Sequence, residues 1–163
     1  MPKVIQETDR GERKRARAIH FVGVFCFVLV LFAALAGLLG KGPLSKVRIG
    51  SVEAGLQIEH FRFIRYQGPV DLKIVVGAQA TTNGMFRLQL SKAFVEQVEI
   101  QRIEPEPEAT TAGPRYFTYT IRTETDAAAE VVVRFVSNHF GRLAYEIGIT
   151  DGPNLKIQDF AFP

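Results

Sequence analysis

The stretch GPVDLKIVVG, residues 68–77, decides the fold class because it has the alternation of a half-buried strand. Apolar residues fill positions 70, 72, 74 and 76, and Asp71 and Lys73 stand between them. Successive side chains of a strand point to opposite faces, so a period of two predicts one face in a core and one face in solvent.

The same alternation recurs along the following part of the chain. The clearest further runs are 86–90 (after the turn signal Asn83-Gly84), 117–121, 131–135, 143–149 and 155–157. About eight strands at this spacing, without long helical patterns, are typical of an antiparallel sandwich. We therefore expect a mainly β domain, an immunoglobulin-like antiparallel β-sandwich, over residues 47–163. That range contains neither Cys nor Trp, which excludes an antibody-type Cys–Trp–Cys core.

Three segments depart from plain alternation. In LQIEHFRF (56–63) and LKIQDFAF (155–162) the apolar set moves by one residue. A shift of one residue exchanges the two faces of a strand, so we expect a β-bulge in each. SKAFVEQV (91–98) predicts one helical turn with Ser91 as its N-cap.

Upstream of this domain lies RKRARAIHFVGVFCFVLVLFAALAGLLGKG, residues 13–42. Residues 18–40 include no Asp, Glu, Lys or Arg. A helix of this length would be roughly 34 Å long, which is enough to cross a hydrocarbon core of about 30 Å. We expect one N-terminal transmembrane helix over residues 18–40, a linker over 41–46, and the sandwich from 47 onward.

The distribution of charge gives the orientation. The net charge of +3 comes from residues 1–17, with six Lys and Arg against three acids, whereas residues 41–163 hold fourteen of each sign. Basic residues beside a membrane helix are retained in the cytoplasm. We expect 1–17 to form a basic cytoplasmic tail and the β domain to be exported. A neutral exported domain has no basic footprint for nucleic acid, so we expect no such partner.

A cleaved export signal is the alternative to an anchor, with Ala34-Leu35-Ala36 as the cleavage site. The apolar run continues through Gly37, which makes it longer than the apolar core of a typical signal peptide, so we expect an uncleaved signal anchor. Small residues spaced by four allow close approach of another helix. The candidate positions for such packing are Ala33, Ala36, Gly37 and Gly40.

Catalytic and metal-binding patterns are weak. The exported histidines, His60 and His139, lie in no recognisable catalytic motif, and we expect both at the surface or in turns. Two isolated histidines and one exported methionine (Met85) give no ligand spacing. We expect a non-enzymatic protein with no metal and no cofactor.

Two segments are candidates for binding a partner. In IEPEPEATTAGP (103–114) the prolines favour an extended, pre-ordered backbone, although a plain connection between strands has the same composition. The second segment is an arginine- and tyrosine-rich stretch before Gly68-Pro69, whose Arg62 and Tyr66 fall on one side of a regular strand, and a solvated strand face is its simpler explanation. The candidate residues are Arg62, Arg65, Tyr66, Glu104, Pro105, Glu106 and Pro107.

Three stretches together resemble a known family. FRFIRYQGPVDLKIVV (61–76), RLQLSKAFVEQVEIQRIEPEPE (87–108) and QDFAFP (158–163) are similar to small bacterial single-pass membrane proteins of unassigned function. The resemblance implies an exported Ig-like domain on the bacterial inner (cytoplasmic) membrane, periplasmic or extracellular, often encoded beside YetF-like membrane proteins. It implies an accessory role and transfers no catalytic residue.

We therefore predict an accessory subunit that binds the bilayer and another integral membrane or envelope protein, with the C-terminal strand as an open edge for a partner strand. The resemblance implies a YetF-like protein as the candidate partner. The alternative is a small-molecule or lipid-binding module whose pocket between the sheets is lined by Phe61, Phe63, Phe160 and Phe162. A third hypothesis, a hydrolase, requires His60 or His139 to converge with a serine and a carboxylate.

Overall fold

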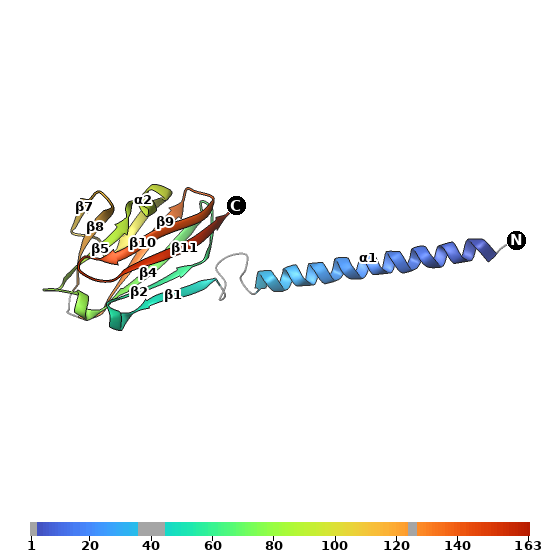
Figure 1. The fold of residues 1–163 in the computed structure, drawn as a ribbon, viewed down its shortest axis with the longest axis horizontal. Helices are drawn as coiled ribbons and strands as arrows, with labels where there is room; N and C mark the ends of the chain where they lie inside the picture. The colour runs from blue at the N-terminus through green and yellow to red at the C-terminus, as the bar shows by residue number, and fades with distance from the viewer. Residues whose placement is uncertain (1–2, 36–44, 124–126) are drawn as a thin grey trace.

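The computed structural model describes residues 3–35, 45–123 and 127–163. One helix, α1 (Lys3–Leu35), precedes a domain built of β-strands (Figure 1). Within the described residues no helix is long and apolar enough to cross a membrane. Residues 36–40 of the expected transmembrane segment lie outside the described residues, as do 41–44 of the expected linker.

The strands form two sheets. Sheet A has the order β1 (Lys46–Ser51), β2 (Leu56–Phe61), β4 (Pro69–Val76), β9 (Ala129–Ser137) and β6 (Val98–Glu104). Sheet B has the order β3 (Phe63–Arg65), β11 (Asn154–Phe162), β10 (Gly141–Ile149), β5 (Met85–Ser91), β8 (Tyr116–Arg122) and β7 (Ala109–Ala112). Neighbouring strands are antiparallel except β3 and β11, which are parallel. Short helical segments are η1 (Val52–Ala54), η2 (Ala78–Ala80) and α2 (Lys92–Gln97).

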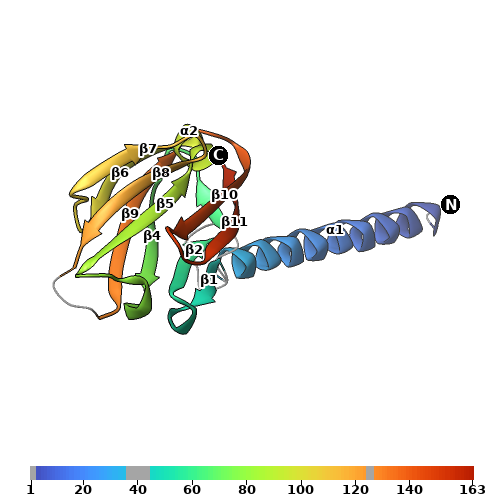
Figure 2. The ribbon, with the colours of Figure 1, turned by 60° about the vertical axis from the view of Figure 1, so that its left-hand side comes forward.

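One hydrophobic core joins the inner faces of both sheets, which lie against each other in Figure 2. In β4 the predicted alternation holds, because Val70, Leu72, Ile74 and Val76 are buried. Sheet B contributes residues such as Leu88 in the same way. The prediction of a mainly β domain of two packed sheets is confirmed.

Both predicted bulges are wrong. β2 pairs with β1 in regular register up to Phe61, after which the chain leaves sheet A and enters β3 of sheet B. β11 pairs with β10 without a register break. In each strand the buried positions continue in phase, but a polar residue fills one of them: His60 in β2 and Asp159 in β11. Polar residues at core positions therefore caused the apparent change of face.

The predicted helical turn is present as α2, and Ser91 stands at its N-cap position. The Ser91 hydroxyl caps no α2 amide, however, and instead accepts a hydrogen bond from the backbone N–H of Glu146 at 3.1 Å. The turn is held down by Phe94, which is fully buried and packs edge-on against Phe135. The turn is thus stabilised by tertiary packing.

One end of the sandwich receives the chain from the linker. There the backbone carbonyl of Ser45 accepts from the N–H of Arg62 at 2.8 Å, and the Ser45 hydroxyl accepts from the N–H of Phe63 at 3.2 Å. The start of β4 at Pro69 and the end of β11 at Phe162 lie at this same end. We call it the linker end, and in Figure 1 it faces α1.

Candidate functional site

A groove lies between the last strand of sheet A and the last strand of sheet B. β6 pairs only with β9 and β7 only with β8, so each has one open edge among the described strands. The space between them, about 500 Å³, we call the edge groove. Its lining residues are Ile100, Gln101, Arg102, Ile103, Glu104, Glu106, Pro107, Thr110 and Tyr119.

Local sequence explains why this side is open. β7 is only four residues long, and all four are exposed, so it has no apolar face on which a further strand could pack. In β6 the pairing with β9 shifts between Ile100 and Arg102. Such an irregularity twists an edge strand away from its neighbour. Pro105 and Pro107, which lack an N–H, lead the chain from one sheet to the other.

The edge groove is lined by two acidic side chains and by one aromatic ring, that of Tyr119. Glu104 forms an ion pair with Arg102 at 2.7 Å. Among the described residues no ion pair involves Glu106, which is exposed. Burial raises the pKa of Tyr119 above its ordinary value, so its hydroxyl stays protonated and can donate. Open strand edges with flanking carboxylates suit an extended peptide, which would bind by main-chain hydrogen bonds.

Just outside the groove, Glu108 forms two contacts with the guanidinium of Arg122, one of them a hydrogen bond of 3.2 Å. These hydrogen bonds hold the pKa of Glu108 below its ordinary value. The connection between β6 and β7 is therefore fastened to β8 at its far end.

The predicted loop residues reach the edge groove. Glu104, Pro105 and Glu106 are exposed and Pro107 is half-buried, as expected for a solvated connection. Glu104, Glu106 and Pro107 line the groove itself. Their role in binding stays a prediction.

The other predicted group lies elsewhere, and the expected geometry is wrong. Arg62 stands between β2 and β3, and Tyr66 follows β3, so the two do not share a regular strand. Both lie at the linker end, where the N–H of Tyr66 donates to the carbonyl of Phe162 at 2.7 Å. In β6 the linker end is marked by Val98, six residues before Glu104, a separation of roughly 20 Å along a strand. The two predicted groups therefore do not form one site.

The small residues proposed for helix packing are only partly covered by the structure. Ala33 lies in α1 and is half-buried. Ala36, Gly37 and Gly40 lie outside the described residues, as does one residue of the Ala34-Leu35-Ala36 cleavage candidate.

A buried polar network, absent from the sequence-based site predictions, joins the two sheets. His60 of β2 places its Nδ1 2.6 Å from Oδ1 of Asp159 in β11. The hydroxyl of Tyr145 in β10 donates to Oδ2 of the same carboxylate at 2.5 Å. Each of the three residues is at most 5% exposed, so the expectation that His60 is a surface residue is wrong. His139, in contrast, lies between β9 and β10 and is exposed, as predicted.

This network uses both oxygens of one carboxylate to connect sheet A with sheet B. Burial, and next the charge and hydrogen bond of Asp159, raise the pKa of Tyr145 well above its ordinary value. The tyrosine is therefore a permanent donor at neutral pH. In the described residues no hydrogen bond joins a serine hydroxyl to His60; the Ser45 hydroxyl binds the backbone of Phe63. The hydrolase hypothesis requires a carboxylate and a serine beside His60. Among the described residues, the carboxylate of Asp159 is hydrogen-bonded to His60, and no serine hydroxyl is.

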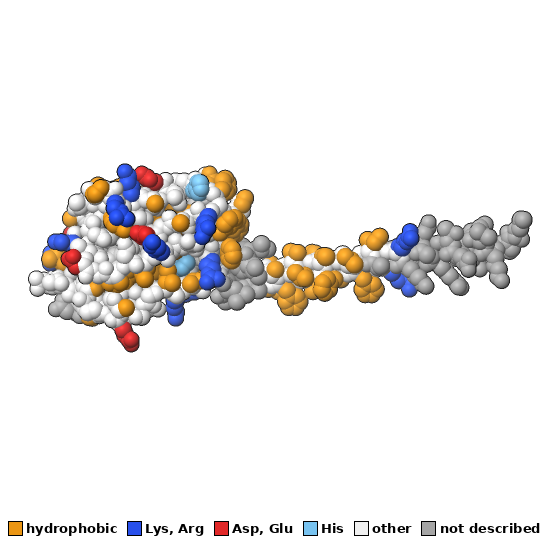
Figure 3. All heavy atoms as spheres, viewed as in Figure 1, with side chains coloured by type: hydrophobic (Ala, Val, Ile, Leu, Met, Phe, Trp, Pro, Cys, Tyr) orange, Lys and Arg blue, Asp and Glu red, His pale blue; other side chains and the backbone are white. Residues whose placement is uncertain are grey.

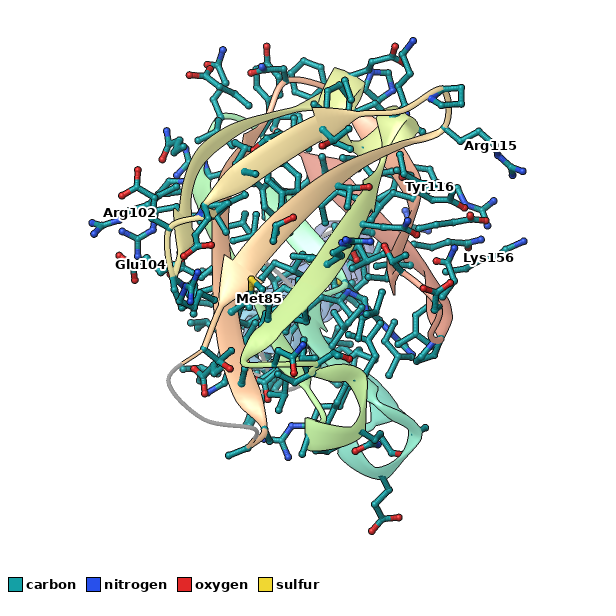
Figure 4. The ribbon with its side chains drawn as sticks, turned by 90° about the vertical axis from the view of Figure 1, so that its left-hand side faces the viewer. Met85, Arg102, Glu104, Arg115, Tyr116 and Lys156 are labelled. Atoms are coloured by element: carbon teal, nitrogen blue, oxygen red, sulfur yellow. The ribbon has the colours of Figure 1, made fainter. Side chains whose placement is uncertain are left out.

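The sandwich has a second groove, of about 360 Å³, beside α2 and β10. Figure 4 shows Arg115, Tyr116 and Lys156 pointing away from the side that carries Arg102 and Glu104. Here the Tyr116 hydroxyl donates to Oε2 of Glu146 at 2.8 Å and, with Lys156, keeps the pKa of Glu146 below its ordinary value. Tyr116, Glu146 and Lys156 thus satisfy one another, and sequence reasoning had not identified these three residues.

No group of three His, Cys, Asp or Glu side chains among the described residues is arranged to hold a metal ion. The pocket proposed for the lipid-binding alternative is also not formed as expected, because Phe160 is 49% exposed on the outer face of β11. In the comparisons with known proteins, no protein-family model and no curated protein matches the chain.

Proposed function

We propose that the protein is a non-enzymatic accessory subunit whose β-sandwich binds another membrane or envelope protein through the edge groove. The observation that carries this proposal is the pair of open strand edges, β6 and β7, flanking one groove. An open edge accepts an extended segment by β-augmentation, and pre-ordered walls reduce the entropy lost on binding. β11 lies between β3 and β10, so the C-terminal strand is not the edge in question.

We further propose that residues 18–40 anchor the chain in the bacterial cytoplasmic membrane, with the tail inside and the sandwich periplasmic or extracellular. Support comes from the uncharged run up to Gly40 and from the basic residues before it. Further support comes from α1, because twelve large apolar side chains between Ile19 and Leu35 are exposed there. A helix that is apolar all round requires apolar surroundings.

The immunoglobulin-like class is likewise a proposal. It is supported by antiparallel strands in two packed sheets and by the repeated passage of the chain between them, as from β4 to β5 to β6. An experimental structure whose strand connectivity differs from every immunoglobulin-like arrangement would contradict it.

In vivo photocrosslinking tests the binding proposal. A photoreactive residue replaces Thr110 in the groove, and the same residue replaces Ala54 in η1 as a control outside it. We expect one companion membrane protein on the Thr110 probe only, and a YetF-like protein is the first candidate by resemblance. Glu106→Lys should weaken this crosslink, whereas Glu53→Lys, a matched exposed charge reversal, should not. Equal crosslinking from both probes, or none from Thr110, would contradict the proposal.

A further inference from the structure

Ion pairing divides the basic side chains of the sandwich into two groups. Eight of them contact carboxylates: Lys46, Arg48, Lys73, Lys92, Arg102, Arg122, Arg134 and Lys156. Five form no ion pair with any described residue: Arg62, Arg65, Arg87, Arg115 and Arg142. Three of these five, Arg62, Arg65 and Arg142, lie at the linker end. Positive charge without an internal counterion is therefore concentrated there.

Exposed aromatic rings gather in the same place. Phe140 and Phe160 are the large apolar residues that the described sandwich leaves exposed, at 51% and 49%. Tyr66 stacks on Phe140 with 3.8 Å between ring centroids. Figure 3 shows hydrophobic and basic side chains side by side at the end of the sandwich that faces α1.

Strand register places rings and guanidinium groups on one surface. Phe160 of β11 lies directly beside Phe63 of β3 and beside Arg142 of β10, and paired residues point to the same face of a sheet. Arg65 is paired with Phe162 in the same way. We define the linker-end patch as Phe63, Arg65, Arg142 and Phe160 on this surface, together with the stacked rings of Tyr66 and Phe140 at the same end of the sandwich.

The covalent connection limits where the linker-end patch can be. This step rests on the proposed anchor, which ends at Gly40. Only residues 41–44 separate Gly40 from Ser45, which is fixed to the sandwich by its hydrogen bonds to residues 62 and 63. Five extended steps span at most about 18 Å. The linker end is therefore always close to the headgroups of the bilayer.

We propose that the linker-end patch docks on anionic phospholipids of the outer bilayer surface. Aromatic rings favour the boundary between headgroups and acyl chains, and guanidinium groups bind phosphate in forked geometry. The short tether keeps the local concentration of lipid high, so weak individual contacts suffice. Docking in this manner holds Glu104, at the far end of the edge groove, roughly 20 Å farther out, where a partner can reach it.

The test uses the full chain, which contains no tryptophan, in nanodiscs. Phe160→Trp reports on the linker-end patch and Ala54→Trp, in η1 at the other end of β2, is its control. Nanodiscs hold phosphatidylcholine with phosphatidylglycerol brominated near the headgroup. We expect strong quenching for Trp at 160 and little at 54. Replacing Arg65 or Arg142 by Ala should lower the docked-to-free ratio about fivefold each.

Three outcomes would overturn the proposal. Equal quenching of the two tryptophans would refute docking while leaving the anchor intact. In a second set of nanodiscs, brominated phosphatidylcholine is the only lipid and phosphatidylglycerol is left out. Quenching as strong as in the first set would refute the preference for anionic lipid. A chain that does not enter nanodiscs would refute the anchor, and docking with it. Phe140→Trp provides a second reporter on a different side chain, and its quenching must agree with that of Phe160→Trp.

Discussion

The helix α1 and the sandwich contain the same apolar residue types, but these side chains are exposed in α1 and mostly buried in the sandwich. Among the residues that the structure describes, fourteen large apolar side chains are exposed: twelve belong to α1 between Ile19 and Leu35, and two, Phe140 and Phe160, belong to the sandwich. The sandwich supplies its own apolar interior, which includes Leu72 and Ile74 at 0% exposure. The described part of the helix leaves its large apolar side chains exposed. This difference is the basis for our proposal that the helix anchors an independently packed domain.

The largest expected effect concerns the interior of the sandwich. Asp159→Ala leaves the His60 ring and the Tyr145 hydroxyl buried without a partner, so we expect the free energy of unfolding to fall by about 3–5 kcal/mol. Urea denaturation followed by circular dichroism measures it. The control replaces all three groups (His60→Leu, Tyr145→Phe, Asp159→Leu) and should be near neutral, because no polar group is then stranded. A loss below about 1 kcal/mol for Asp159→Ala would contradict the assigned network.

The next effect concerns the helix alone. Leu29→Arg places a charge in the middle of the uncharged run, at an apparent insertion cost of about 2.5–3.5 kcal/mol. We expect the share of the protein that resists carbonate extraction from membranes to drop, with Leu29→Ala as the control for lost side-chain volume. The urea midpoint of the sandwich should be unchanged. If Leu29→Arg destabilises the sandwich instead, the two regions are not independent.

The local alternation of apolar and polar residues predicts strands correctly where every core position is apolar. It fails where a polar residue occupies a core position. Positions 70–76 were predicted correctly because each core position is apolar. His60 and Asp159 occupy core positions too, yet their polarity looked like a change of face, and two bulges were wrongly inferred. A signal for the correct register was present in the sequence. His60 and Asp159 each lie two residues after a buried isoleucine, so they continue the period of two.

The edge groove was predictable only in part. Its loop residues Glu104 and Glu106 stood out because proline interrupts them. β7 was not predicted, since four exposed residues have no buried face and therefore no alternation. Ile100 and Tyr119, which complete the groove, come from different sheets, and no local spacing relates them. Sites built between sheets require the sheet order, which a short-range pattern does not contain.

A smaller effect sharpens the description of the interior. The phenol of an unfolded chain ionises near pH 10. Because burial raises the pKa of Tyr145, the folded state keeps a proton that the unfolded state has lost above that pH. Stability should therefore decline as pH rises from about 10, by up to about 1.4 kcal/mol per pH unit. Tyr145→Phe should reduce this slope in urea titrations between pH 9 and 11. If Tyr145→Phe and the unmodified protein show the same slope, the assignment of Tyr145 as a buried proton donor is contradicted.

The smallest effect is expected on the surface. Lys73 and Glu130 form an ion pair at 2.8 Å, nearly as short as the His60–Asp159 contact, but their side chains are 43% and 52% exposed. Solvent screens such a pair, so Lys73→Ala should change the free energy of unfolding by less than about 1 kcal/mol. Urea denaturation beside Asp159→Ala provides the direct comparison. If Lys73→Ala and Asp159→Ala lower the free energy of unfolding equally, burial does not determine how much the two contacts stabilise the sandwich.

The native cysteine offers the most direct test of the anchor. Cys26 lies within α1, and its side chain is exposed in the isolated chain. In intact membranes we predict that Cys26 resists a water-soluble maleimide and reacts only after denaturing detergent is added. A cysteine placed at the exposed Ala54 of a Cys26→Ala chain should react without detergent. Rapid labelling of Cys26 in intact membranes would contradict the anchor.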